Sequence, residues 1–372
     1  YGGRQADLQR LSLAGSAGHC VSLVGMSNIG KSYVLRALCQ TAPAPLAPGR
    51  SLVYVDCNLM VEFTEQGFYE LVLRCLCSLA AGTLSEVVVA RLNACRADVV
   101  APSSPFLGHL RFSEGIAAAC EAFTDGLVLV LDEFDACMQA LDDRVLLNLR
   151  ALRDTYPERL AYLTATRKRL ECIRRAHGAV EFAEMFTYAT AFLAPLDVPG
   201  TTALVRQCAV AHDLAVGPGD IPLLMDETGG HPALVTAAAH GLSRMRRDAV
   251  ALGRPLHETQ VREQLDGDPA CHDECLKLWH DLDSDERAAL LGSASSQAAG
   301  TRAWQSLAER YVARAGSTPP EPFCRLFARY VQRHRIAAET HSRGIRVDVD
   351  AGEVWVDGHR LPPLTDLEYR LL

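Results

Sequence analysis

The sequence has few lysines, no long apolar run and no regular cysteine framework. Lys31, Lys168 and Lys277 are the only lysines among 37 basic residues, a bias toward arginine that GC-rich coding explains. No run of about 18 uncharged apolar residues occurs, which excludes a membrane-spanning helix. The 13 cysteines are scattered through apolar segments. Since their number is odd and their spacing irregular, they predict reduced thiols in a cytoplasm rather than a disulfide scaffold.

Positive charge is also in deficit. The net charge of -8 argues against a nucleic-acid-binding surface over the whole protein, although a local basic patch is compatible with an acidic average. A length of 372 residues, with 49% hydrophobic and 22% charged, predicts a globular chain of two or three domains. The chain shows no signal peptide, begins at Tyr1 without a methionine and ends at Leu372. We therefore expect it to be a piece of a longer protein.

Cys271, His272 and Cys275 are spaced closely enough to suggest a metal site. No second ligand pair follows at zinc spacing. The segment "ACHDECLKLW" also fits a helix whose thiols face a core, and this is the interpretation that we favour.

A phosphate-binding loop is the strongest signal. The pattern G-x-x-x-x-G-K-[ST] is met between the apolar strand "CVSLV" and the helical pattern "SYVLRALCQ". Its glycines let backbone N–H groups surround phosphates at a helix N-terminus, the lysine neutralises β and γ oxygens, and the serine coordinates Mg²⁺. The loop predicts ATP or ADP binding by Gly25, Met26, Ser27, Asn28, Ile29, Gly30, Lys31, Ser32 and Tyr33.

A buried-type strand within "GLVLVLDEFDA", residues 126–136, delivers two acids at its carboxyl end. We expect Asp132 to hold Mg²⁺ through water, together with Ser32, and Glu133 to orient and polarise the attacking water. Two solvated acids that cap a strand are the alternative, and the upstream loop makes it the weaker one.

Strands and helices alternate through this half of the chain. Strands are expected at 51–58 and 160–167, and helices at 65–82, in "SEGIAAACEAF" and in "RVLLNLRALRDTY". This alternation predicts an α/β fold with a parallel sheet covered by helices on both faces. The last strand places Thr164, Thr166 and Arg167 at its carboxyl end, where Arg167 suits a terminal phosphate. A basic helix start with Lys168 and Arg169 solvated is the open alternative.

These motifs resemble the STAND group of signalling P-loop ATPases, which are related to AAA+ proteins and include NB-ARC, NACHT and archaeal-type ATPases. The opening "YGGRQADLQRL" is similar to the segment "GR-x-x-E-L-x-x-L" that lies against adenine in this family. Gly3 and Arg4 match it, while Asp7 replaces the usual Glu. "TATR" resembles the sensor after the fourth strand, which together with the phosphate loop and acidic strand gives Lys31, Asp132, Glu133 and Arg167 catalytic roles.

The segment "DETGGHPALVTAAAHGL", residues 226–242, resembles the helical lid of the family. By that resemblance Pro232 packs on adenine and His231 touches a phosphate. From the residues alone, a helix ends at Gly229-Gly230 and the next begins with Pro232 in its first turn, so His231 is equally well a helix cap.

The remainder of the chain resembles two further modules. "CLKLWHDLDSDERAALLGSAS" and "LAERYVARAGSTPPEPFCRLFARYVQRH" look like a winged-helix domain, and "LDSDER" predicts a helix cap with acids in its first turn. "IRVDVDAGEVWVDGHRLPPLTDLEYRLL" predicts two short strands around "DAGE" and a helix from Thr365. It resembles the start of an OmpR/PhoB-type DNA-binding domain, matched by Gly358, Leu364, Thr365, Glu368, Leu371 and Leu372.

The resemblance implies four parts: a P-loop domain (1–198), a helical lid (199–255), a winged-helix domain (256–338) and a truncated winged-helix start (339–372). It implies a slow ATPase switch, closed with ADP, that opens or self-associates with ATP and controls an effector. One alternative is a ring-forming AAA+ motor, for which Arg153, Arg174 or Arg175 would serve a neighbouring subunit. Another is an ATP-regulated transcription factor. DNA contact is expected only through the missing remainder of the last domain.

Overall fold

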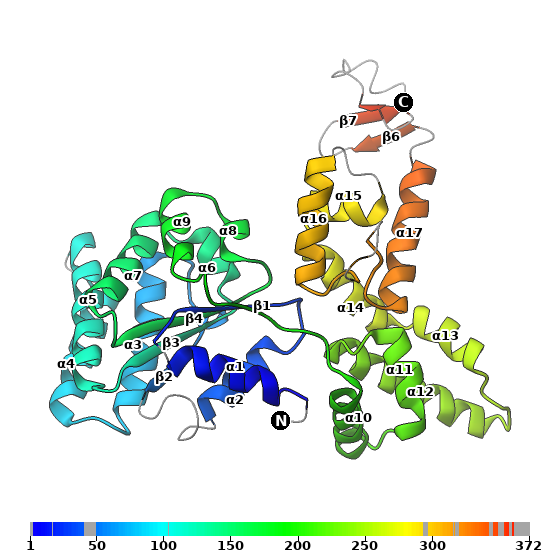
Figure 1. Cartoon of the computed structure of the whole chain (residues 1–372), viewed down its shortest axis with the longest axis horizontal. Coiled ribbons are helices and arrows are strands. Elements are labelled where there is room, and N and C mark those ends of the chain that lie inside the picture. The colour runs from blue at the N-terminus through cyan, green and yellow to red at the C-terminus, as the bar shows by residue number, and fades with distance from the viewer. Residues whose placement is uncertain are drawn as a thin grey trace.

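The computed structural model describes residues 3–16, 18–40, 50–102, 104–292, 297–314, 316, 320–341, 345–348, 353–356 and 359–360. A sheet-containing part and an all-helical part lie side by side, and a small sheet lies beyond the helical part (Figure 1). Among the helices of these residues, none is both long and apolar enough to cross a membrane.

The central sheet has five parallel strands in the order β2-β3-β4-β1-β5. Strand β3, which is rich in leucine and valine, and strand β4 are buried along their whole length, as expected when helices cover both faces. The predicted parallel α/β sheet is therefore confirmed. The fifth strand was not predicted. The strands are β1 (Val21–Val24), β2 (Ser51–Asp56), β3 (Leu127–Asp132), β4 (Leu160–Thr166) and β5 (Thr190–Phe192).

Helices cover the sheet from two sides in Figure 1. Below it lie α1 (Gln5–Ser16) and α2 (Lys31–Gln40), and above it lie α6 (Asp135–Ala140), α7 (Asp143–Thr155), α8 (Leu170–Ile173) and α9 (His177–Glu184). A short 3-10 turn, η1 (Cys57–Leu59), follows β2. Three helices that pack on one another lie beside the edge strand β2, namely α3 (Glu65–Ala80), α4 (Glu86–Val100) and α5 (Pro105–Ala122).

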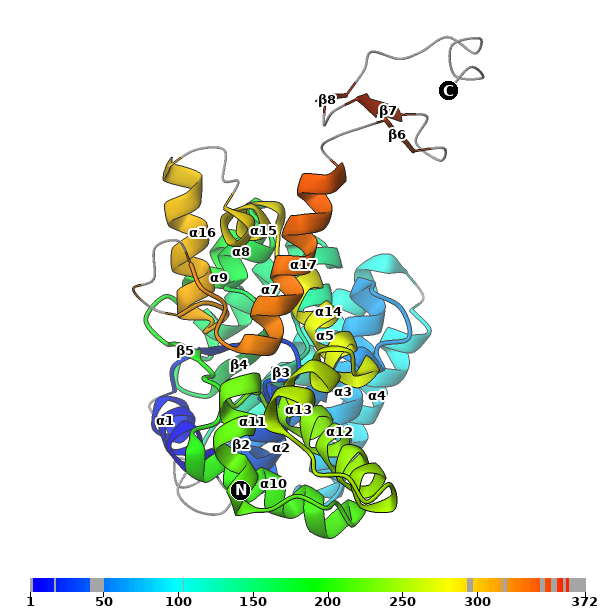
Figure 2. The same cartoon turned by 90° about the vertical axis from the view of Figure 1, so that its right-hand side faces the viewer.

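The helical part begins where β5 leads into α10 (Val198–His212). Next come the 3-10 turn η2 (Pro218–Asp220), α11 (Ile221–Thr228) and the long α12 (Pro232–Ala251), which pack together. Two more helices, α13 (Glu258–Asp266) and α14 (Pro269–His280), connect this group to the last three. Figure 2 shows α10–α13 below and α15–α17 above.

The last helical group contains α15 (Ser284–Leu291), α16 (Gln297–Glu309) and α17 (Arg325–His341). The predicted cap of α15 is confirmed, because Asp283 accepts from the Glu286 N–H at 2.9 Å and Glu286 accepts from the Asp283 N–H at 3.0 Å. A single bridge between Ala313 and Pro322 joins the chain on either side of the α16–α17 connection. The winged-helix assignment of this group stays a prediction.

The two predicted strands around "DAGE" are confirmed as an antiparallel pair. They are β6 (Ile345–Asp348) and β7 (Glu353–Val356), and β8 (His359–Arg360) adds a third strand. The predicted helix from Thr365 and all the residues matched to the OmpR/PhoB-type pattern lie outside the described residues. Cys271 and Cys275 are buried in α14, as the core interpretation predicted. Among the described residues, no group of three or more His, Cys, Asp or Glu side chains is arranged to hold a metal ion.

Candidate functional site

The predicted phosphate-binding loop lies between the end of β1 and the start of α2. Gly30 has a φ of +102°, a conformation that a side chain would strain, and Asn28 also lies in the left-handed region at +56°. These two left-handed residues turn the chain sharply into α2, whose first residue is Lys31. The N-terminus of α2 therefore adjoins the loop, and the positive end of a helix dipole favours an anion there.

Lys31 lies at the foot of the loop with only 4% of its surface exposed. Its Nζ donates to the carbonyl oxygens of Gly25 at 3.0 Å and Met26 at 3.1 Å. Burial lowers the pKa of the Lys31 ammonium, while Glu133 and neighbouring carboxylates oppose that shift. Since this buried cation is held only by carbonyl dipoles and more distant charges, it is well placed to attract an anion.

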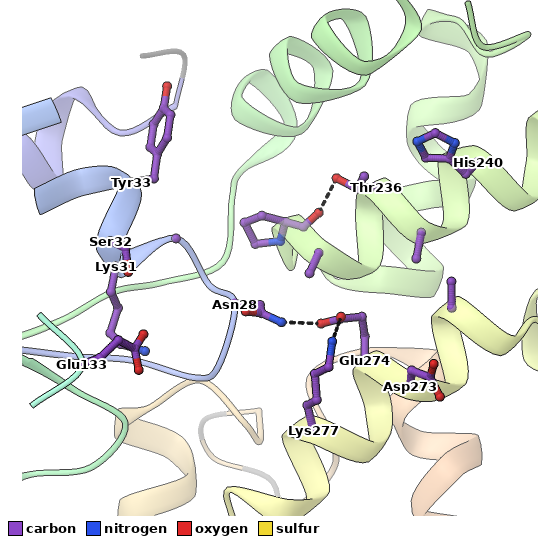
Figure 3. Close-up of a pocket in the computed structure, with 15 residues that line it drawn as sticks. Asn28, Lys31, Ser32, Tyr33, Glu133, Thr236, His240, Asp273, Glu274 and Lys277 are labelled. Carbon is purple, nitrogen blue, oxygen red and sulfur yellow. Dashed lines mark hydrogen bonds and ion pairs between the residues drawn. The ribbon is translucent and has the colours of Figure 1, made fainter. Parts of the chain in front are cut away.

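The carboxyl end of β3 carries the two acids. In the sheet, β3 is separated from β1, which leads into the loop, by β4 alone. Asp132 is fully buried and accepts the Tyr54 hydroxyl at 2.6 Å and the Glu133 N–H at 3.0 Å. Glu133 has a positive φ of 52°, and Figure 3 shows its carboxylate near the ammonium of Lys31. Burial raises the pKa of Glu133, and the charge of Lys31 opposes the shift. The two acids are thus in distinct settings, one fixed by hydrogen bonds and one facing the cleft.

Ser32 and Asp132 fit a magnesium ion that is shared with phosphates. Mg²⁺ is usually bound by one or two side chains together with phosphate oxygens and water, rather than by a full protein cage. Ser32 borders the cleft beside Lys31, and Asp132 is a carboxylate oriented by Tyr54 and a backbone N–H. This small donor set suits that mode of binding.

Arg167 lies at the end of β4 and is held from two sides. Its N–H donates to Asp135 at 3.0 Å, and its Nη1 donates to Asp281 Oδ1 at 3.1 Å. The other oxygen of Asp281 accepts the Ser27 N–H of the phosphate-binding loop at 3.0 Å. Neither Asp135 nor Asp281 was singled out from the sequence. Asp281 follows α14, 254 residues after Ser27, so no local pattern could have paired them.

The two residues after Arg167 also contact the helical part. Lys168 forms ion pairs with Asp283 at 2.7 Å and Glu286 at 2.8 Å, and Arg169 forms one with Glu309 at 2.9 Å. Lys168 and Arg169 are therefore paired with acids rather than fully solvated, although α8 does begin directly after Arg169, as the alternative expected. The end of β4 is bound to the α14–α16 region by consecutive basic residues.

His231 connects the start of α12 to the phosphate-binding loop. Its Nδ1 accepts the Leu234 N–H at 3.4 Å as the N-cap of α12, so its Nε2 carries the hydrogen and donates to the Ser27 carbonyl at 2.8 Å. Burial lowers the pKa of the ring to about 4, which keeps it neutral. Both ring nitrogens are thus used within the protein, and contact of His231 with a phosphate stays a prediction.

Gly230 holds the turn between α11 and α12 close to Leu196, which follows β5. A side chain there would place a Cβ 2.0 Å from the Leu196 carbonyl oxygen, and the φ of Gly230 is +76°. Its own carbonyl accepts the Leu196 N–H at 2.9 Å. The close approach therefore requires glycine, and it positions Pro232 at the start of α12.

A mostly apolar pocket of about 380 Å³ lies where the N-terminal segment, the loop, α10 and the start of α12 meet. Arg4 fixes one wall, because its guanidinium donates at 2.6 Å to the carbonyl oxygens of both Ala194 and Ile29. Gly3 packs against Gly200 next to it. A mostly apolar pocket with a few polar groups is the usual form of a small-molecule site. It is lined by Arg4, Ile29, Gly30, Tyr33, Leu196, Ala203, Leu204, Gln207, Cys208, Ala211, His212 and Pro232.

A second, more open cleft of about 710 Å³ continues from this pocket past the loop. Figure 3 shows Lys31 and Ser32 on one side and α12 and α14 on the other. Asn28 of the loop donates to Glu274 of α14 at 2.8 Å, and Glu274 also pairs with Lys277. Gly30, Tyr33 and Pro232 border both cavities. Together they form one elongated site with an apolar end and a phosphate-binding end.

The comparisons with known proteins place the fold. No family model and no curated protein matches the chain. A solved Walker-type ATPase of Pyrococcus abyssi is similar over 88% of this chain and 95% of its own, at 12% identity and a TM-score of 0.59. Cdc6p of Pyrobaculum aerophilum is similar over 98% of this chain and 92% of its own, at 13% identity and a TM-score of 0.43. The RuvB Holliday junction branch migration motor of Thermotoga maritima is similar over 99% of this chain and 94% of its own, at 12% identity and a TM-score of 0.39. The main fold is the α/β fold of P-loop NTPases.

Proposed function

We propose that this chain is a nucleotide-dependent switch of the STAND type, which is closed when it holds ADP and opens or self-associates when it holds ATP. The observation that carries the proposal is the elongated site itself. Its walls come from the phosphate-binding loop, from α12 and from α14, so a nucleotide there touches all three parts. A ligand that binds only this closed arrangement stabilises it by mass action, and slow exchange follows.

The residues have separate tasks in this proposal. The apolar pocket takes the adenine between Pro232 and the Arg4 side, and the loop amides with Lys31 hold the phosphates. Glu133, with its raised pKa, orients and polarises the attacking water, and Arg167 is positioned to contact the terminal phosphate. Mg²⁺, held by Ser32 and Asp132 with the phosphates, would supply neutralising charge. Slow, regulatory hydrolysis of ATP is the expected activity.

The first test is to denature the purified chain and to quantify the released nucleotide by ion-exchange chromatography. The switch predicts near-stoichiometric ADP, since a closed site retains its ligand through purification. An empty site that exchanges nucleotide freely would contradict a closed switch and favour a fast-cycling motor.

Lys31→Ala tests the site directly. Charge-assisted contacts to a phosphate contribute about 1.5–3 kcal/mol, so retained nucleotide should fall at least about tenfold. Arg206→Ala is the matched control, because it removes an exposed cation from α10 outside both cavities. Normal nucleotide content in Lys31→Ala would show that the loop is not the binding site.

A ring-forming AAA+ motor is the second candidate function, and it needs an arginine that reaches a neighbouring subunit. Arg153 donates to the Gly18 carbonyl at 3.1 Å, and Arg174 pairs with Asp143 at 2.5 Å. Both are thus engaged within their own chain, which leaves the exposed Arg175 as the free candidate of the three. Of these three arginines, the motor would thus depend on Arg175, whereas the switch needs no arginine from a neighbouring subunit. Control of DNA binding by an attached domain is compatible with the switch, and would act through residues beyond those described.

A further inference from the structure

Asp281 lies in an unexpected place for a residue of the helical part. It is the C-cap of α14, and its side chain is only 6% exposed because it reaches across to the phosphate-binding loop. One carboxylate oxygen accepts the Ser27 N–H at 3.0 Å, and the other accepts from Arg167 Nη1 at 3.1 Å. A single carboxylate therefore bridges a loop amide and the arginine at the end of β4.

Both donors are groups that a nucleotide phosphate would use. Backbone amides of such a loop surround phosphate oxygens, and a guanidinium at the end of the neighbouring strand β4 suits the terminal phosphate. The carboxylate also lies close enough to Lys31 to act on its charge. Asp281 thus takes the place of a bound anion at Ser27 of the loop. A carboxylate and a terminal phosphate cannot both occupy these donors, because two anions in so small a volume repel strongly.

Arg167 has a second anchor that does not depend on Asp281. Its backbone N–H and Nε face Asp135, at 3.0 Å and 3.5 Å, within the sheet part itself. When Asp281 leaves, Arg167 therefore stays in position to receive another anion. The exchange alters only which negative group the arginine holds.

We propose that Asp281 is a specificity-determining residue that makes the closed site select a nucleoside diphosphate over a triphosphate. The inference rests on the proposed function and deepens it. A diphosphate leaves the Asp281 contacts intact. A triphosphate must displace the carboxylate, and with it the turn that carries Asp283 and Glu286, whose ion pairs with Lys168 lie directly beyond. Displacement of Asp281 is thus the step that couples the terminal phosphate to opening.

The test is the ratio of two affinities, measured by isothermal titration calorimetry on the full chain freed of nucleotide. The ligands are Mg-ADP and the non-hydrolysable analogue Mg-AMPPNP. We expect the wild type to bind ADP at least about tenfold more tightly, which corresponds to about 1.4 kcal/mol. Asp281→Asn and Asp281→Ala should bring the ratio of affinities close to one by strengthening AMPPNP binding and leaving ADP binding nearly unchanged.

Asp285→Asn is the matched control. It removes one negative charge four positions further along the same segment, from an exposed side chain in the first turn of α15. It should keep the wild-type ratio. Circular dichroism establishes that each variant is folded, and the wild-type ratio tests the inference even if a variant fails to fold.

The outcomes separate the two proposals. Equal affinities of the wild type for both ligands, or an unchanged preference for ADP in folded Asp281→Ala, overturns the role of Asp281 while nucleotide binding stands. If neither the wild type nor any variant binds either ligand, the proposed function itself fails.

Discussion

Glu133 combines a strained backbone with a perturbed charge. Its φ of 52° is rare for a residue with a side chain, and such strain costs about 1–3 kcal/mol. Burial raises the pKa of its carboxyl group, and Lys31 beside it opposes the shift. Strain and shifted pKa values both concentrate at functional sites. Neither property is visible in the letters "LDEFD", yet both support the role that the sequence predicted for this residue.

Glu133→Gln should keep nucleotide bound and slow its hydrolysis. General-base assistance contributes about 10²–10⁴-fold, so single-turnover hydrolysis of bound ATP should fall by about 10²-fold or more. The amide keeps the size of the side chain but cannot accept a proton. Quenched time points, analysed for ADP, measure the rate.

The pH dependence provides the control for that experiment. A base works only when ionised, and burial moves the pKa of Glu133 upward, so wild-type hydrolysis should decline on acidification at a pH above the ordinary glutamate value of about 4.3. The slow residual rate of Glu133→Gln should lack this decline. The same acidic limb in the variant would assign the titration to another group.

At the scale of helices and strands, periodicity and apolar runs predicted most of the sheet part. The runs "VLVL" and "LAYLTAT" are fully buried strands, and three- and four-residue spacing located α3 and α7. Several elements were missed, namely β5, α4 and the helices α1, α6 and α9, and α8 was expected only as an alternative. Strand β5 is only three residues long and pairs at the sheet edge, and α4 has apolar residues all around, so that no face stands out. Short or evenly apolar segments give no period to detect.

Only part of the candidate site was predicted from the sequence. Motifs located the loop, the acidic strand and the arginine after β4, because these residues adjoin strand ends. Tyr54, which holds Asp132, and Asp135 and Asp281, which hold Arg167, come from other elements and carry no motif. Their roles arise from sheet order and from helix packing, which bring together residues up to 254 positions apart.

The cap of α12 provides a test at this scale, because His231 joins that helix to the loop as a neutral ring. Its pKa is about 4 in the folded chain and about 6.5 when unfolded. The unfolded state therefore binds more protons between these values, and stability is full above pH 6.5 and is lost as the pH falls toward 4. The loss should reach about 3 kcal/mol. Urea unfolding at several pH values measures it.

His231→Asn is the companion variant for this measurement. Asparagine is a good N-cap and can still accept the Leu234 N–H, but it does not titrate and is too short to reach the Ser27 carbonyl. The variant should be less stable than the wild type at pH 7 and should lose less stability on acidification. An equally steep pH dependence in both proteins would show that other groups cause it.

For the whole molecule, the end of β4 is the main polar connection between the sheet part and the last helices. Arg167, Lys168 and Arg169 pair with acids before, within and after α15. The strand that leads to Arg167, the arginine that we propose contacts the terminal phosphate, is thereby also the strand that holds the helical part. Events at the phosphate end of the site can reach the distant helices through a few ion pairs.

The pair of Arg169 and Glu309 allows this connection to be tested away from the nucleotide. The two side chains are about one-third exposed and lie outside both cavities. Glu309→Arg replaces an attraction with a repulsion. Partly exposed pairs contribute up to about 1 kcal/mol, so ADP should be released about two- to fivefold faster, as measured by chasing bound fluorescent ADP with excess ADP.

The reversed pair, Arg169→Glu with Glu309→Arg, distinguishes a closing contact from a local disturbance. It restores opposite charges across the same interface, so the release rate should return toward that of the wild type, whereas two independent defects would add.

Salt provides a second criterion. The Debye length falls from about 30 Å at 0.01 M to about 8 Å at 0.15 M, so higher ionic strength should speed release from the wild type and reduce its difference from Glu309→Arg. If the release rate changes neither with the charge reversal nor with salt, these ion pairs do not hold the molecule closed, and closure must depend on the apolar contacts of α10 and α12.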